Sequence, residues 1–236
     1  MPGRCARSLL FSWVLACACA PLVALDPGHT DAHPGAVSVR GIPEVSYNDA
    51  FVAVLGPRLS RDGFRVLVTR GPGEEIELSA RADRANARRA SVLLSIHHDS
   101  VQEDLLEEVP QNGRTAMRTV RPVRGYSLFV SGQNPRYEDS LKVAEAIGRR
   151  LLALGRPPSL HHAERIPGEG RTLLDERLGI YRFDELAVLR EASCPAVLLE
   201  VGVLVDEADE AYIADPARRE ALSEAIAQGL LDARGN

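Results

Sequence analysis

The pentapeptide LDPGH at residues 25–29 decides how the sequence around it is interpreted, and Glu44 follows its last residue by fifteen positions. Residues 21–25 form a short apolar run that predicts a buried strand, and the Pro-Gly turn dipeptide ends that strand. His29 is therefore expected at the C-terminal end of a strand, and Glu44 at the start of the next helix. A neutral imidazole and a carboxylate on neighbouring element ends are suitable ligands for one metal ion.

The segments that follow alternate between helix and strand patterns. Strands alternating with helices predict a three-layer α/β domain with a largely parallel sheet and helices on both faces. In such folds the functional site lies beyond the C-terminal ends of the strands. The predicted helices cover residues 44–61 (with Pro57 expected to kink or shorten it), 78–90, 139–154 and 216–231. The predicted strands cover residues 64–69, 91–96, 125–130 and 195–199, with a short one at 187–189.

Two of these strands end in further candidate catalytic groups. Residues 91–96 lead into His97, and residues 195–199 lead into Glu200. An open zinc site needs three protein ligands and leaves a fourth position for a water whose pKa falls to about 7. A separate carboxylate then takes the proton and passes it to a leaving nitrogen. The predicted ligands are His29, Glu44 and His97, and the predicted base is Glu200.

Each candidate also has a purely structural interpretation. His29 could be an ordinary loop histidine, and Glu44 a carboxylate favoured by the helix dipole. Glu200 is the sharpest signal, because a carboxylate inside an apolar strand needs a partner or a function. On pattern alone His33 and His98 remain alternative ligands. The pair at 161–162 lies in a polar segment and is expected to be solvated.

Composition and charge limit the function classes. The 236 residues suit one large domain or two small ones, and the net charge of −5 gives no basic footprint for nucleic acid. No internal apolar stretch reaches the length of a membrane-spanning helix. Cys194 is the one cysteine outside the N-terminal segment, which argues against a disulfide framework and predicts a small core residue.

The N-terminal segment, residues 1–20, has the pattern of an export signal. Arg4 and Arg7 precede a short apolar stretch that runs to Ala20. Cleavage after small residues and acylation of Cys17, at a lipobox-like sequence, are alternative fates. The prediction is an exported protein of the bacterial periplasm or cell envelope, with a catalytic domain over residues 21–236.

Two regions lack a regular pattern. Residues 101–123 mix acidic and basic side chains without a clear period, which predicts an irregular insertion. Two interpretations stay open: a flap that borders or covers the substrate groove, and a solvated loop with no role. Residues 155–186 are rich in glycine, proline and charge and are expected to be mostly loop.

The order of these segments resembles the zinc-dependent N-acetylmuramoyl-L-alanine amidases, the bacterial cell-wall amidases of the amidase-3 type. The resemblance covers about residues 22–231. It rests on LDPGH (25–29), GIPE (41–44), GFRVLVTR (63–70), LSARADRAN (78–86), SIHHDS (95–100), GYSLFVSG (125–132), AVLR (187–190) and PAVLLEVGVL (195–204).

The resemblance implies a phosphorylase/hydrolase-like mixed sheet and one Zn²⁺ ion held by His29, Glu44 and His97, with Glu200 as catalytic acid and base. It prefers His97 over His98. The implied substrate is peptidoglycan, cut between the lactyl group of N-acetylmuramic acid and the L-alanine of the stem peptide. The sequence departs from the family pattern at residues 30–31, where glycines are common, at Val203, where an aromatic is usual, and in the unmatched insertion.

Three other functions fit parts of the pattern. A metallopeptidase on a similar sheet would cut peptide bonds within the stem. A wall-binding module without turnover would have no need of the buried carboxylate at Glu200. An iron(II) oxygenase also uses two histidines and one carboxylate, but a further carboxylate placed as a base fits hydrolysis better. Targeting is expected from the catalytic domain, a lipid or a partner. An unidentified protein activator is a further candidate partner.

Overall fold

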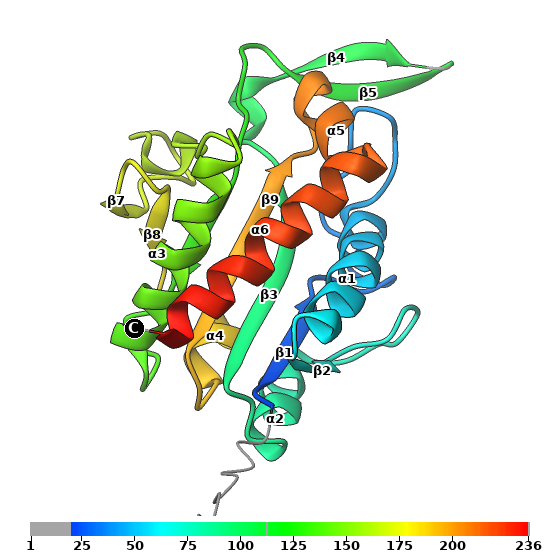
Figure 1. The fold of residues 1–236 in the computed structure, drawn as a ribbon. Coiled ribbons are helices and arrows are strands. Elements are labelled where there is room, and N and C mark those ends of the chain that lie inside the picture. The colour runs from blue at the N-terminus through cyan, green and yellow to red at the C-terminus, as the bar shows by residue number, and fades with distance from the viewer. Residues whose placement is uncertain (1–19, 112, 236) are drawn as a thin grey trace, which may run out of the picture.

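The computed structural model describes residues 20–111 and 113–235, and its centre is a seven-stranded mixed sheet (Figure 1). The strand order is β2-β1-β3-β9-β6-β8-β7. Neighbouring strands are parallel except for the β6–β9 and β7–β8 pairs, so the predicted fold class is confirmed. The strands are β1 Leu22–Pro27, β2 Arg65–Val68, β3 Val92–Asp99, β6 Ser127–Val130, β7 Thr172–Asp175, β8 Ile180–Arg182 and β9 Ala196–Val203.

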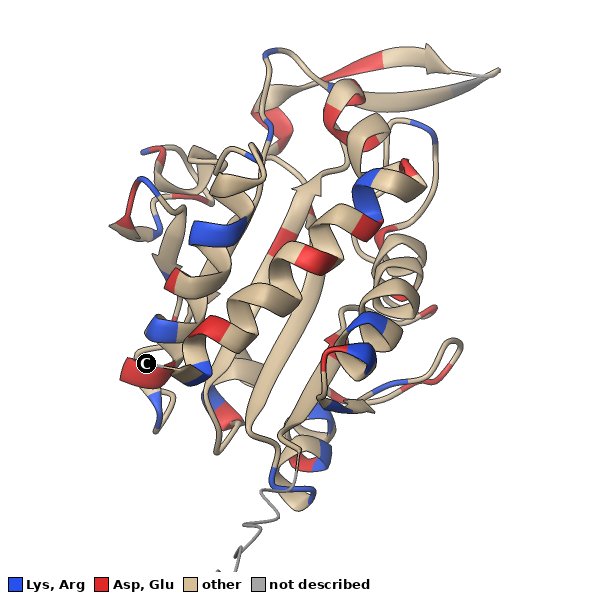
Figure 2. Ribbon diagram, viewed as in Figure 1, with Lys and Arg blue, Asp and Glu red and all other residues tan. Residues whose placement is uncertain are grey.

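Helices cover both faces of the sheet. On one face α1, α3 and α6 pack over a large apolar core, and on the other α2 and α4 pack over a smaller one. In the view of Figure 2 charges of both signs are interspersed over helices and loops, while the central strands are largely uncharged. The helices are α1 Glu44–Arg61, α2 Leu78–Ala87, α3 Tyr137–Ala153, α4 Ala187–Glu191, α5 Glu207–Ala214 and α6 Pro216–Gly235, with 3-10 turns at Glu103–Leu105 and His161–Ala163.

The alternation of side chains along β3 and β9 assigns each residue to one face. Leu94 and Leu199 belong to the core under α1, α3 and α6, whereas Leu93 and Leu198 belong to the core under α2 and α4. His97 lies an even number of residues from Leu93, and Glu200 an even number from Leu198. Both therefore face the α2 and α4 side, because strand side chains alternate with period two.

Pro57 does not shorten α1, which continues to Arg61 as predicted from the apolar spacing. Proline removes the N–H that would bond the carbonyl four residues earlier. That residue, Ala53, is exposed, so water can bond its carbonyl. The cost of the missing hydrogen bond is therefore small on this face of the helix.

The prediction that residues 101–123 are irregular is wrong. Residues 101–123 contain a β-hairpin, β4 Leu106–Gln111 and β5 Arg114–Thr119, which pair only with each other among the described strands. The hairpin projects from one end of the molecule (Figure 1). No residue of β4 is buried and half of them are exposed, so no apolar alternation was needed and the sequence carries none. Val101 and Val123 anchor its base in a small cluster with Val203 and Val205.

Three smaller differences concern short elements. The apolar run at 187–189 starts helix α4 instead of a strand, because a run this short has no distinguishing period. The mostly irregular region 155–186 also holds β7 and β8, which extend the sheet at one edge. Helix α5 was not predicted, and the side chain of Asp206 caps its start.

Residues 1–19, and with them the predicted leader and Cys17, lie outside the described residues. Within the described part of the chain, no helix combines the length and apolar character needed to cross a bilayer.

Candidate active site

The three predicted ligands meet where β1 ends, α1 begins and β3 nears its end. His29 follows β1, Glu44 is the first residue of α1, and His97 lies near the end of β3. Glu44 Oε2 lies 3.0 Å from His29 Nε2, and Glu44 Oε1 lies 3.1 Å from His97 Nδ1. One ligand atom from each residue falls within 4.8 Å of the other two. The two alternative histidines are elsewhere: His33 is exposed, and His98 is buried on the opposite face of β3.

Two glycines let the three side chains approach. A Cβ built on Gly28 would lie 2.2 Å from His97 Cε1, and one built on Gly35 would lie 2.4 Å from Glu44 Oε2. Gly35 also has a φ of +75°, which favours glycine. The Pro-Gly turn of the LDPGH motif therefore has two roles. It ends the strand, and it leaves room for the His97 ring.

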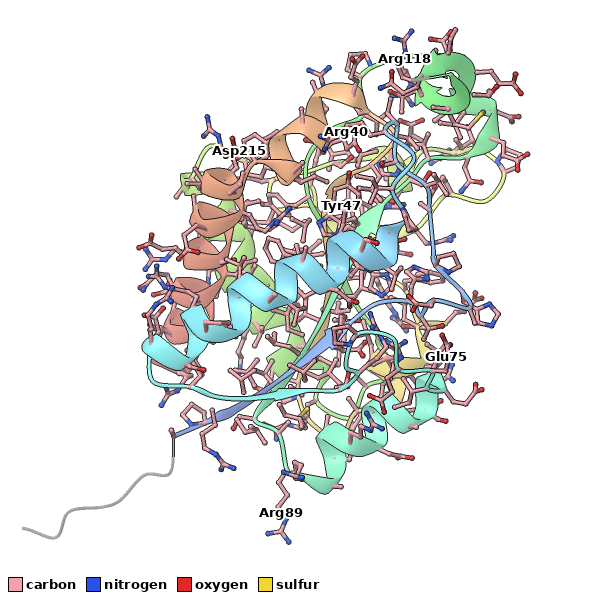
Figure 3. All side chains as sticks on the ribbon, turned by 90° about the vertical axis from the view of Figure 1, so that its right-hand side faces the viewer. Arg40, Tyr47, Glu75, Arg89, Arg118 and Asp215 are labelled. Carbon is pink, nitrogen blue, oxygen red and sulfur yellow. The ribbon has the colours of Figure 1, made fainter. Side chains whose placement is uncertain are left out.

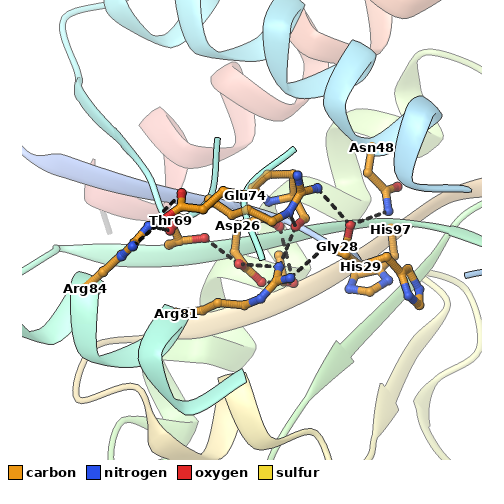
Figure 4. A network of polar contacts seen from close by, with 12 residues as sticks. Asp26, Gly28, His29, Asn48, Thr69, Glu74, Arg81, Arg84 and His97 are labelled. Carbon is orange, nitrogen blue, oxygen red and sulfur yellow. Dashed lines mark hydrogen bonds and ion pairs between the residues drawn. The ribbon is translucent and has the colours of Figure 1, made fainter. Parts of the chain in front are cut away.

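The backbone that carries His29 is held by two buried arginines. His29 has a φ of +66°, a strained conformation for a non-glycine residue. Its carbonyl accepts a 2.6 Å hydrogen bond from Arg81, and the Gly28 carbonyl accepts one of 3.1 Å from Arg70 (Figure 4). Arg81 is in turn paired with the buried carboxylate of Asp26. These contacts fix the turn that presents the imidazole.

Glu44 is kept ionised at the centre of the group. Burial alone would raise the pKa of its carboxyl, but hydrogen bonds from His29 and His97 hold that pKa well below its usual range. The carboxylate also accepts hydrogen bonds from the backbone N–H groups of Ala36 and His98. These contacts leave a fixed negative charge between two imidazoles.

His98 supports the group from the other face of the strand. Burial lowers the pKa of its imidazole to about 3, so the ring is neutral. Its Nδ1 pairs with Asn48 Oδ1 at 2.8 Å, and the Asn48 amide donates to Glu44 Oε1 at 3.1 Å. The structure therefore places His98 in a packing role behind the three residues.

The loop after His29 is tied down by α1 and α5. Arg40 and Tyr47, labelled in Figure 3, both reach Glu210 on α5, Arg40 at 3.1 Å and Tyr47 at 2.5 Å. Burial, followed by the hydrogen bond to Glu210, raises the pKa of the Tyr47 hydroxyl, which keeps it a donor. The loop thus enters α1 with Glu44 in a defined position.

The donor set of His29, Glu44 and His97 fits a divalent metal. Two imidazole nitrogens and one carboxylate are the ligands of many open zinc sites. Tetrahedral ligands at about 2.0–2.1 Å from zinc lie roughly 3.3 Å from one another. His29 Nε2 and His97 Nδ1 lie at similar separations of 3.0 and 3.1 Å, each from a different oxygen of the Glu44 carboxylate. These residues and the family comparison below together indicate a metal site.

Glu200 lies beside this group on β9, directly opposite His97 in the β3–β9 register. It lines a cavity of about 230 Å³ together with Asp99, Phe129 and His162. Its Oε2 is buried and has no hydrogen-bond partner among the described residues. Burial, then the negative charges of Asp99 and Glu44, raise the pKa of this carboxyl well above its usual value. Such a raised pKa is typical of a carboxyl that exchanges protons in catalysis.

This raised pKa predicts a pH-dependent stability. Because the folded state favours the neutral carboxyl, its contribution is fully present below the unfolded pKa near 4.5 and is lost as the pH rises through the higher folded pKa. Glu200→Gln removes the titration. The variant should therefore gain stability over the wild type as pH rises from 4.5, by up to about 1.4 kcal/mol per pH unit. Urea unfolding of both metal-free proteins across a pH series measures this difference, and a constant difference would contradict it.

The prediction that the histidine pair at 161–162 is solvated is wrong. The side chain of His161 is 2% exposed and that of His162 is 12% exposed. His162 pairs with Asp99 and Glu169, and Gln102 donates to Glu169. His162 and Glu200 line the same cavity. The sequence carried no periodic signal for this cluster, because a loop positions it. Cys194 is buried as predicted, and burial raises the pKa of its thiol to about 11.

Comparison with known sequences agrees with these features. A family model described as N-acetylmuramoyl-L-alanine amidase matches residues 23–232. The amidase AmiC of Neisseria meningitidis is 27% identical over 222 residues, covering 89% of this chain and 52% of that protein. The probable cell wall amidase LytH of Staphylococcus aureus is also 27% identical, covering 88% and 56%. The chain thus spans about half the length of these curated relatives.

Solved structures share the fold. The N-acetylmuramoyl-L-alanine amidase of Clostridium difficile 630 superposes with a TM-score of 0.70 at 25% identity, covering 93% of this chain and 99% of that one. The amidase Ami1 of Mycobacterium smegmatis gives a TM-score of 0.72 at 23% identity, covering 92% and 98%. At 23% identity, the likeness to Ami1 shows a shared fold and nothing more.

Proposed function

Because the chain belongs to the N-acetylmuramoyl-L-alanine amidase family, we propose that it is a zinc-dependent peptidoglycan hydrolase. The bond it cuts is the amide between the lactyl group of N-acetylmuramic acid and the L-alanine of the stem peptide. The observation that carries the proposal is the convergence of His29, Glu44 and His97 beside a buried carboxyl with a raised pKa, Glu200.

In this proposal His29, Glu44 and His97 hold the metal. Zinc bound there would supply Lewis-acid chemistry and a water acidified to a pKa of about 7. Glu44 contributes the negative charge of the ligand set, and Asn48 and the His98 backbone N–H orient its Oε1. The arginine contacts to the 27–29 turn keep His29 in place while substrate enters.

Glu200 is assigned the proton transfers. Its free Oε2 can accept the proton of the attacking water, and the same carboxyl can then protonate the departing alanine nitrogen. Burial raises the pKa of this carboxyl and so makes its neutral form more accessible, as a group that must alternate between base and acid requires.

A larger cavity gives the substrate access to the metal ligands. About 630 Å³ in volume, it reaches from His29 and His97 to the apolar side chains of α4, including Val188 and Leu189. Leu186 and Leu198 line both this cavity and the one at Glu200. A peptide stem and its sugar can therefore lie across β3 and β9, with the scissile amide beside His97 and Glu200.

We propose that residues 21–236 form the catalytic domain. Within it, the base of the 101–123 insertion is proposed to border the substrate groove at the Glu200 cavity. Val101 and Gln102 line the cavity at Glu200, whereas no residue of β4 or β5 lines either cavity. Replacing residues 108–117 by an Asn-Gly turn between the paired Glu107 and Arg118 should keep the hairpin closed. Turnover of a soluble muramyl peptide should stay within about twofold. A large loss would show that the hairpin tip covers the substrate.

The family and the substrate place the proposed activity outside the cytoplasm. We propose export through the signal-like residues 1–20, with acylation of Cys17 as one outcome of processing. Mass spectrometry of the protein from cell fractions tests this. Full-length chains with an intact N-terminus in the cytoplasm would contradict it.

Metal removal tests the activity itself. Purified peptidoglycan should release stem peptides that begin with free L-alanine, and a chelated sample should release none until zinc is restored. Product masses and N-terminal analysis distinguish the candidates. New N-termini within the stem would indicate a metallopeptidase, and binding without release would indicate a wall-binding module.

A further inference from the structure

A second group of metal-type ligands lies beside Glu200. Asp99 Oδ2 is 2.9 Å from His162 Nε2 and 3.4 Å from His161 Nε2, and these three ligand atoms lie within 4.8 Å of one another. We propose that Asp99, His161 and His162 form a second divalent-cation site, suited to zinc and separate from the group of His29, Glu44 and His97.

The two imidazoles are oriented as metal ligands usually are. A ligating histidine typically uses its other ring nitrogen to bond a carboxylate or another polar group, which fixes the ring. His162 Nδ1 pairs with Glu169 Oε2 at 3.0 Å, and His161 Nδ1 pairs with Ser159 Oγ at 2.9 Å. Gln102 donates to the other Glu169 oxygen at 3.0 Å. His162 Nε2 thereby faces Asp99 Oδ2 at 2.9 Å, and His161 Nε2 lies 3.4 Å from the same oxygen.

An unsatisfied buried atom points to a ligand. His161 is 3% exposed, and its Nε2 has no hydrogen-bond partner within the described chain, since its approach to Asp99 is not aligned for one. Buried polar atoms without partners are rare in native proteins. A cation between Asp99 and the two imidazoles would bind the lone pair of His161 Nε2. Asp99, His161 and His162 would then supply three ligands.

The surrounding charge and space also suit a cation. Asp99, Glu169 and Glu200 line the same cavity of about 230 Å³, which also contains His162 and Arg171. The cavity gives the cation an open side for water, next to Glu200. Two nitrogens and one carboxylate oxygen are a donor set that favours zinc over magnesium or calcium.

The competing interpretation is a protonated His162 held between two carboxylates, with no metal. Counting zinc separates the two. The metal-free protein is equilibrated with Zn²⁺ alone and desalted, and its zinc is measured by mass spectrometry. The wild type should hold two zinc ions and His161→Gln one, while the matched control His33→Gln, on an exposed loop, should hold two.

Two further variants assign the ions. His97→Ala should keep one zinc, and the double variant with His161→Gln should keep none. Glu169→Gln keeps the shape of the side chain at position 169. It should weaken zinc binding at the second site by about 10–100-fold. Circular dichroism checks folding, and anomalous diffraction from crystals soaked in Zn²⁺ locates the ions. One zinc in the wild type, unchanged in His161→Gln and lost in His97→Ala, would overturn the second site and leave the proposed function intact.

Discussion

Glu200→Gln is expected to keep its metal and its fold while losing at least about a hundredfold in turnover, the usual scale of acid–base catalysis. The amide keeps the size of the carboxyl but cannot accept a proton from water. Glu200 lies outside the group of His29, Glu44 and His97, so the metal should not depend on it. Zinc content tests whether the metal is retained, and release of stem peptides tests whether turnover is lost. Both are measured on the same preparation.

His97→Ala is the matched comparison, because it removes a ligand from the neighbouring strand at the paired position. Metal affinity and turnover should fall together in this variant. The assignment of roles is wrong if Glu200→Gln loses zinc while His97→Ala retains it at the first site. Full activity in Glu200→Gln would remove the proposed acid and base altogether.

Gly28→Ala is expected to lose metal and activity through a single added methyl group. Its Cβ would lie 2.2–2.5 Å from three atoms of the His97 ring, so the ring has to move. The backbone cannot yield easily, since Gly28 N donates to the Ile96 carbonyl and Gly28 O accepts from Arg70 and Asn48. Zinc affinity should fall by at least about 10–100-fold, the effect of disturbing the support of a ligand.

Gly56→Ala is the control for this substitution. Gly56 lies inside α1, and the nearest atom to an added Cβ is 3.8 Å away. This variant should bind zinc normally and gain about 0.5–1 kcal/mol of stability, because alanine is the better helix residue. Zinc titration and thermal unfolding of both variants make the comparison. Gly28→Ala with normal zinc affinity would show that His97 is not held against the turn.

Local sequence patterns determined the layered fold. The helix at 44–61 was predicted to the residue. The buried strands predicted at 91–96 and 195–199 are the N-terminal parts of β3 and β9, which continue through His97 and Glu200. Apolar periodicity is a property of each segment alone, so it can be recognised without knowing which segments pack against it. The same patterns named His29, Glu44, His97 and Glu200, since each follows or begins a predicted element.

Tertiary structure decided what the patterns left open. The choice between His97 and His98 depends on which face of β3 meets Glu44, and that follows from strand pairing and the packing of α1. The hairpin at 101–123 is held mainly by pairing between its own strands, so its exposed side chains carry no apolar period.

The histidine pair at 161–162 is the clearest case of a site that only the fold creates. Its segment is polar and irregular, and from sequence it is indistinguishable from a solvated loop. The contact of His161 with Ser159 and the contacts of His162 with Asp99 and Glu169 hold it beside Glu200. A loop's burial depends on distant partners, here Asp99 some sixty residues earlier, and no local period encodes such a contact.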